Sequence, residues 1–260
     1  MTDQNNNNRR IIRPRHHRPG ENLDSTTDGF SPKKDWDRHK KSSYHTYNYK
    51  MPGKYDSILA FKIWPADKWD KMVTENLPGP INRIAILDIG TASGRLLEKL
   101  VSAGAVNLAA CDLAPRMVEF ARHRLEKMNL SVGLKPADAE YRLPWPDNQF
   151  DAAVLSGVLH HFRHPRKALT EIRRVLKNRG RLIVIEPFFP PPIRHIFNLG
   201  LRIMPHEGDC RYYSLKEVES LLTEGGFDII KKGRFTRLSL YAIGDLPDHD
   251  NDRSDPKESA

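Results

Sequence analysis

The chain has 260 residues, which is long enough for one large α/β domain with further segments on either side. No apolar run approaches the ~20 residues of a membrane span, the polar N-terminus predicts no signal peptide, and two cysteines predict a reducing, cytoplasmic location. The formal net charge of +9 would attract a nucleic acid, an anionic lipid or an acidic substrate, or would simply keep the domain in solution. Net charge alone does not distinguish between these roles.

Residues 1–50 are rich in Asn, Arg, His and Pro and carry 11 Lys and Arg against 6 Asp and Glu. This composition predicts a disordered basic tail, in which the cluster from Arg9 to Arg18 is either a polyanion-binding arm or simply solvated. Residues 244–260 carry 2 basic against 6 acidic residues and predict an acidic disordered tail. The folded domain is therefore expected over 51–243.

Within the domain, the aromatic-rich stretch 44–77 predicts helices that pack ahead of a sheet. Apolar strands and amphipathic helices then alternate, which predicts a parallel sheet covered on both faces. Two final strands have no helix between them and should form an antiparallel hairpin, giving seven strands of mostly parallel α/β type. The expected strands are 84–89, 106–111, 131–135, 151–156, 181–186, 227–235 and 238–243, and the expected helices are 94–103, 115–129, 165–178 and 215–224.

The segment from Asp88 to Gly94 joins the first strand to the next helix through a turn bounded by glycines. Glycine allows backbone conformations and a ligand approach that a Cβ would block. The helix that follows points its N–H groups at the loop. Because like charges repel in a partly dry site, Asp88 suits a cationic ligand end better than a pyrophosphate.

Acidic residues recur at the ends of the first three strands, as Asp88, Asp112 and Asp138. Ligands bind at this edge of an open parallel sheet. Asp112 can accept hydrogen bonds from both hydroxyls of a ribose, and Asp138 can accept one from an adenine amino group. A helix cap or turn would explain any single aspartate. Recurrence at three strand ends favours a ligand instead.

Six motifs in order extend this pattern beyond the glycine loop. They are Leu87 to Gly94, Cys111 to Met117, Ala137 to Glu140 with Leu143 to Asp151, Leu159 to Phe162, Arg174 to Arg181, and Gly225 to Phe227. In these motifs the chain resembles the class I S-adenosylmethionine-dependent methyltransferases over about 55–243. The likeness is to the small-molecule group that includes quinone-biosynthesis enzymes, and it implies a Rossmann-like fold.

The resemblance implies which residues hold S-adenosyl-L-methionine. Asp88, Gly90, Thr91, Ala92 and Gly94 would surround the methionine part, with Ser156 near it; Asp112 would bind the ribose; Leu113, Met117, Asp138 and Ala139 would contact the adenine. Two positions depart from the usual pattern. Ala92 replaces a frequent glycine, and Asn178-Arg179-Gly180 replaces a Pro-Gly-Gly turn. Neither change is expected to prevent cofactor binding.

His160 and His161 are the candidate bases for removing a proton from the acceptor, since imidazole titrates near neutrality. The alternative is that one of them packs or binds the cofactor backbone while the other only shapes the pocket. His160 and His164 also have the helical spacing of metal ligands. Because no cysteine or carboxylate ligand is expected nearby, no metal is predicted.

The segment 187–213 has the length and position of a lid over the acceptor pocket. Its apolar stretch with Arg194, His195 and Arg202 suits a small hydrophobic or lipid-like acceptor and leaves contact with a membrane surface open. An ordinary buried helix is the alternative.

Three other functions compete with small-molecule methylation. A nucleic-acid methyltransferase would fit the charge, but base-amino methylation needs an Asp/Asn-Pro-Pro-aromatic motif where this chain has Leu155 to Val158. A dinucleotide oxidoreductase would prefer G-x-G-x-x-G to Gly-x-Ala-x-Gly. A non-catalytic cofactor-binding module is the third.

Overall fold

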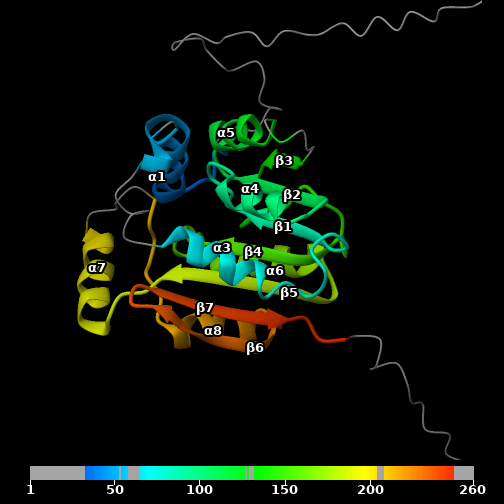
Figure 1. Ribbon diagram of the computed structural model, residues 1–260. Coiled ribbons are helices and arrows are strands. Elements are labelled where there is room, and N and C mark those ends of the chain that lie inside the picture. Colours follow the sequence, from blue (N-terminus) through cyan, green and yellow to red (C-terminus); the bar gives the residue numbers. More distant parts are fainter. Residues whose placement is uncertain are drawn as a thin grey trace, which may run out of the picture.

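The computed structural model describes residues 33–52, 54–57, 65–126, 128, 132–203 and 208–248. Its centre is a seven-stranded sheet in the order β3-β2-β1-β4-β5-β7-β6 (Figure 1). Neighbours among the first five strands run parallel, while β7 runs antiparallel to β5 and β6. The strands are β1 (Ala85–Ile89), β2 (Asn107–Asp112), β3 (Gly133–Pro136), β4 (Phe150–Ser156), β5 (Leu176–Pro187), β6 (Asp228–Thr236) and β7 (Ser239–Asp245). The predicted mostly parallel sheet with a C-terminal hairpin is confirmed.

Helices cover both faces of the sheet, because successive strand residues point to opposite sides. Leu87 and Ile89 of β1 join a core with residues of α6 and α8, whereas Ile86 joins a second core with residues of α3 and α4. Ser214 and Glu217 form a capping box at the start of the helix Leu215–Glu224. The helices are α1 (Arg38–His45), α3 (Ala66–Thr74), α4 (Arg95–Ser102), α5 (Pro115–Glu126), α6 (Pro165–Val175), α7 (Pro191–Ile203) and α8 (Leu215–Glu224). Among the described residues, no helix combines the length and apolarity needed to cross a membrane.

The basic tail predicted over 1–50 reaches too far into the chain. α1 and a π-helical turn, Thr46–Lys50, occupy its last part, and Asp37 caps α1 by accepting from the backbone N–H of Lys40 at 2.8 Å. Tyr44 and Asn48 are buried. Polar and aromatic groups make these contacts, so hydrophobic patterning did not reveal them. Residues 1–32, including the arm from Arg9 to Arg18, lie outside the described part of the chain.

The acidic tail predicted from residue 244 also begins too early. β7 continues to Asp245, whose carboxylate accepts two hydrogen bonds of 2.7 Å from the guanidinium of Arg181 on β5. Asp248 contacts Arg179. These acidic residues therefore balance arginines of the domain itself, and residues 249–260 lie outside the described residues.

The junction between α6 and β5 differs from the expected helix 165–178 and strand 181–186. α6 ends at Val175 and β5 begins at Leu176. Phe150 of β4 pairs with Leu176 and Ala152 pairs with Arg181, so the residues between them bulge out of the ladder. Arg179 in this bulge has a φ of 58°. The expected surface turn at 178–180 is thus a bulge within a strand.

Candidate active site

The glycine loop after β1 is packed so closely that its small residues are required. Gly90 and Gly94 have φ angles of 73° and 77°. A Cβ on Gly90 would lie 2.5 Å from the Val158 side chain, and one on Gly94 would meet the backbone of α5 at 2.9 Å. Ala92 also has a positive φ, 47°, which is less favourable for alanine than for glycine. Its N–H donates to Oδ2 of Asp112 at 2.9 Å, which ties the loop to the end of β2.

Asp88 at the end of β1 is a buried carboxyl group whose Oδ2 has no hydrogen-bond partner among the described residues. Burial raises the pKa of Asp88 to about 7, and the charge of Asp112 acts in the same direction. The neighbouring hydroxyl of Thr91 opposes part of this rise in pKa. Both residues line one cavity. A buried carboxyl group with an unsatisfied oxygen beside a cavity favours a polar ligand, and the carboxylate favours a cationic one.

The first of two adjoining cavities lies over the ends of β1 and β2 and has about 790 Å³ of empty space, part of which is open to solvent. Asp112 lies in its wall, and its two oxygens accept hydrogen bonds of 2.9 Å from the backbone N–H groups of Ala92 and Ala114. Burial nevertheless raises the pKa of Asp112 above its ordinary value. Both oxygens of Asp138 lie 2.9 Å from Nζ of Lys40, which comes from α1. The first cavity therefore has a carboxylate at the end of β2 and another after β3.

The second cavity is larger, with about 1290 Å³ of empty space that also opens to solvent, and its walls are mostly aromatic and apolar, including Trp69, Pro187 and Tyr212. Asp88, Ser156 and Asp209 supply polar groups to it. The residues that line both cavities are Tyr47, Tyr55, Gly90, Ala92, Gly157 and His161. The two cavities are therefore continuous at the glycine loop, with His161 at their junction.

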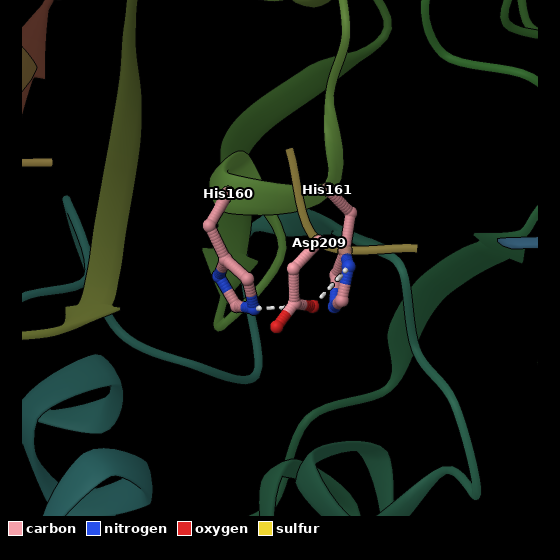
Figure 2. A group of neighbouring side chains, drawn as sticks. All are labelled: His160, His161 and Asp209. Carbon is pink, nitrogen blue, oxygen red and sulfur yellow. Dashed lines mark ion pairs between the residues drawn. The ribbon is translucent and has the colours of Figure 1, made fainter. Parts of the chain in front are cut away.

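Each of the two histidines is paired with its own carboxylate. His160 and His161 lie on the 3-10 turn Leu159–His161 after β4, and Nδ1 of His160 donates to Glu186 at 2.7 Å. Asp209 enters from the segment after α7, and its Oδ1 lies 3.1 Å from Nδ1 of His161 and 3.8 Å from Nε2 of His160 (Figure 2). Nε2 of His161 is 3.4 Å from the hydroxyl of Tyr47. Nδ1 of His161 also lies 3.1 Å from the carbonyl of Gly208, so this carbonyl and the two carboxylates together fix the ring orientations.

The positive charge of His160 and the negative charges of Asp209 and Glu186 stabilise one another. Burial opposes the charge on His160, but Glu186 and Asp209 raise its pKa above the ordinary value. Burial also opposes the charge on Asp209, but the bond to His161 and the nearby imidazole of His160 hold its pKa well below the usual range. Asp209 is consequently ionised at neutral pH.

The expectation that no carboxylate lies near these histidines was wrong. Glu186 and Asp209 both contact them, and ligand atoms of His160, His161 and Asp209 lie within 4.8 Å of one another. His164 does not belong to that group. The spacing could accommodate a metal ion, although the ion pairs by themselves account for the grouping.

Comparison with known proteins decides the family. A family model described as a methyltransferase domain matches residues 87–184. A demethylmenaquinone methyltransferase of Thermotoga maritima is 30% identical over 218 residues, which are 74% of this chain and 91% of that relative. The chain belongs to the class I S-adenosylmethionine-dependent methyltransferases.

Other relatives of this methyltransferase match over a shorter range. A demethylmenaquinone methyltransferase of Thermus thermophilus is 40% identical over 119 residues, or 45% of this chain and 53% of that relative. The matched part thus spans about half the length of that and several other curated relatives. A solved S-adenosylmethionine-dependent methyltransferase from Aquifex aeolicus has the same fold, with a TM-score of 0.56 and 23% identity over 68% of this chain and 89% of that one.

Most of the predicted cofactor residues of the methyltransferase do line the cavities. Asp112, Leu113, Asp138 and Ala139 line the first, Asp88, Thr91 and Ser156 line the second, and Gly90 and Ala92 line both. Gly94 and Met117 line neither of these cavities formed by the described residues. Met117 lies in the first turn of α5 and is fully buried in the core, while Gly94 packs against α5. Their contribution is to packing beneath the loop.

Several residues at the methyltransferase site were missed in the sequence. Lys40, Tyr47 and Tyr55 come from the segment ahead of the sheet, whose richness in aromatic residues was the one available signal. Asp209 and Tyr212 come from the segment after α7. No local motif marks these two, because a lone aspartate near a tyrosine is ordinary in any loop.

Proposed function

We propose that this chain transfers a methyl group from S-adenosyl-L-methionine to a small, lipid-like acceptor of the quinone class. The observation that carries the proposal is the junction of the two cavities. There His161, oriented by Asp209, lies between a first cavity with two carboxylates and a larger cavity with aromatic walls. The names of the demethylmenaquinone methyltransferases among its relatives support a quinone-class acceptor.

The residues of the first cavity, together with Asp88 and Thr91 at the adjoining edge of the second, fit the cofactor. Asp112 would accept hydrogen bonds from the ribose hydroxyls, and Leu113 and Ala139 would contact the adenine. Asp88, with its unsatisfied oxygen, would bind the ammonium group at the methionine end, next to Thr91. Asp138 would face the adenine amino group, and Lys40 now holds both of its oxygens. The bound cofactor supplies an electrophilic methyl group on a sulfonium, whose carrier departs as a neutral thioether.

The residues of the second cavity would orient the acceptor and remove its proton. Asp209 holds Nδ1 of His161, so Nε2 is the atom that would take the proton from an acceptor hydroxyl. Glu186 holds His160 in the same turn and favours its charged form, which stabilises ionised Asp209. The aromatic walls would exclude water and align the ring of the acceptor with the methyl group.

The test is methyl transfer from radiolabelled S-adenosyl-L-methionine to a reduced, prenylated demethylnaphthoquinone, with transfer RNA and duplex DNA as competing acceptors. We expect the label in the organic-soluble quinone. Label in nucleic acid instead would contradict the proposal. Cofactor binding by calorimetry without transfer to any of these acceptors would point to a non-catalytic module.

Variants at the junction identify the base. His161→Gln and Asp209→Asn should lower kcat by about 10²–10⁴-fold and leave cofactor affinity nearly unchanged, because general-base catalysis contributes that much. His164→Gln is the matched control, since His164 lines neither described cavity. An equal loss of kcat in all three variants would refute a specific role of His161 and Asp209 in proton removal. Loss of activity in EDTA, restored by Zn²⁺, would assign the two histidines and Asp209 to a metal instead.

A further inference from the structure

α7 is a helix of 13 residues, all described, and none of them is buried. Its exposed large hydrophobic residues are Ile193, Ile196, Phe197, Leu199 and Ile203, and two of them, Ile196 and Ile203, are 68% and 70% exposed. Figure 1 shows α7 standing beside the end of the sheet, apart from the layers of helices that cover its faces. An exposed apolar helix face of this kind ordinarily marks a contact with another protein or with a membrane.

The side of α7 that faces the protein is fixed by two contacts. Asn198 exchanges two hydrogen bonds with the backbone of Tyr212, at 2.8 Å and 3.0 Å. The ring of Phe197 packs edge-on against Phe189 at 4.8 Å between centroids. Because residues three and four apart share a helix face, Ile196, Leu199 and Ile203 form one stripe, nearly opposite Asn198. That stripe points away from the protein.

The charge on this segment has one sign. From Pro187 to Ile203 the sequence contains Arg194, His195 and Arg202 and no acidic residue. By helical periodicity, Arg202 and the polar ring of His195 lie together along one side of the apolar stripe, while Arg194 lies toward the protein side. An apolar stripe bordered by a cation and free of acidic groups matches the interface of an anionic bilayer, where acyl chains take the aliphatic groups and headgroups take the charge. A protein partner would need its own acidic, apolar groove to do the same.

We propose that α7 docks this protein onto the surface of a membrane containing anionic lipid. Ile196, Leu199 and Ile203 enter the acyl boundary, and Arg202 contacts the headgroups. Tyr212, which anchors α7, also lines the second cavity, and Phe189 lies 4.8 Å from its ring. The docked helix therefore lies beside the cavity that would receive a lipid-like acceptor. Only this delivery role rests on the proposed function; the docking itself does not.

The test measures binding of the full chain to sedimented vesicles in the absence of any methyl donor or acceptor. Vesicles of phosphatidylcholine with about one third phosphatidylglycerol are compared with pure phosphatidylcholine. We expect binding to the anionic vesicles that weakens as salt is raised, because the headgroup contribution is screened. The double variant Ile196→Ser/Ile203→Ser should bind about tenfold or more weakly.

Matched variants separate docking from a general loss of surface apolarity. Val106→Ser/Ile230→Ser removes two aliphatic groups that are 62% and 50% exposed elsewhere, and should bind vesicles like the unmodified chain. Arg202→Gln should weaken the preference for anionic vesicles. Activity on a water-soluble, short-chain quinol should be the same in every variant.

Three outcomes would overturn the proposal: no vesicle binding by the unmodified chain, equal binding by both double serine variants, or no preference for anionic lipid. A dimer seen by light scattering that Ile196→Ser/Ile203→Ser dissociates, with no vesicle binding, would show that α7 is covered by a second copy. Absence of methyl transfer alongside intact vesicle binding would contradict the proposed function and leave the docking in place.

Discussion

At the scale of single residues, Asp88 should make cofactor binding depend on pH. Its pKa of about 7 exceeds the ordinary value of 3.8, so below neutrality the empty site holds a protonated carboxyl group. A cationic ligand end favours the ionised form, so affinity should strengthen as pH rises through this pKa. From pH 6 to pH 7 the dissociation constant of S-adenosyl-L-methionine should fall about fivefold, as measured by calorimetry.

Asp88 also makes the stability of the empty protein depend on pH: stability should fall as pH rises, whereas cofactor affinity should increase. Because burial raises the pKa of Asp88 in the folded state, ionisation costs stability as pH rises from about 4 toward 7. Asp88→Asn should remove this dependence from the empty protein, and it should bind the cofactor weakly with little change between pH 6 and pH 7. An unchanged pH profile in Asp88→Asn would mean that another group titrates.

At the scale of elements, Lys40 ties α1 to two buried carboxylates beside the first cavity. Nζ of Lys40 lies 2.9 Å from Asp138 and 2.5 Å from Glu140, whose side chains are only 6% and 3% exposed. Lys40→Met would leave two buried carboxylates without their cation, at a cost of about 3–5 kcal/mol. We expect α1 to lose protection in hydrogen exchange and the cofactor affinity to fall at least about tenfold.

Lys41→Met is the matched control on the same helix, because Lys41 is exposed. It should leave hydrogen exchange and affinity as they are. Equal behaviour of the two variants would show that α1 is held instead by its other contacts, which include the hydrogen bond between His39 and the carbonyl of Gly208.

At the scale of the whole molecule, stability depends on the two cores on either side of the sheet. Ile183 in β5 is fully buried and pairs with Val154 of β4 and Ile243 of β7. Ile183→Ala should lower the free energy of unfolding by about 2–5 kcal/mol, and Ile183→Val by about 0.5–1.5 kcal/mol. Urea denaturation measures both. Ile230→Ala on β6, where the side chain is 50% exposed, should cost well under 1 kcal/mol.

The fold was predictable because its signals are local and repeated. The alternation of apolar strands with amphipathic helices, the glycines of the loop and the capping box at Ser214 each report a nearby structure. The predicted ends of helices and strands were wrong where a residue distant in the sequence determines where the element starts or stops. Asp245 belongs to β7 because Arg181 pairs with it, and Leu176 begins β5 because Phe150 of β4 pairs with it. Neither partner is adjacent in the sequence.

The sequence by itself determined the family fold, the glycine loop and the series of carboxylates after successive strands. Parallel strands bring their carboxyl ends to one edge, so the spacing of Asp88, Asp112 and Asp138 was enough to place them together. Only the tertiary structure decided what closes the site. Lys40 reaches Asp138 across 98 positions, and Asp209 meets His161 across 48. Such pairs form because burial and opposite charge select them among many candidates, and no periodic pattern records that choice.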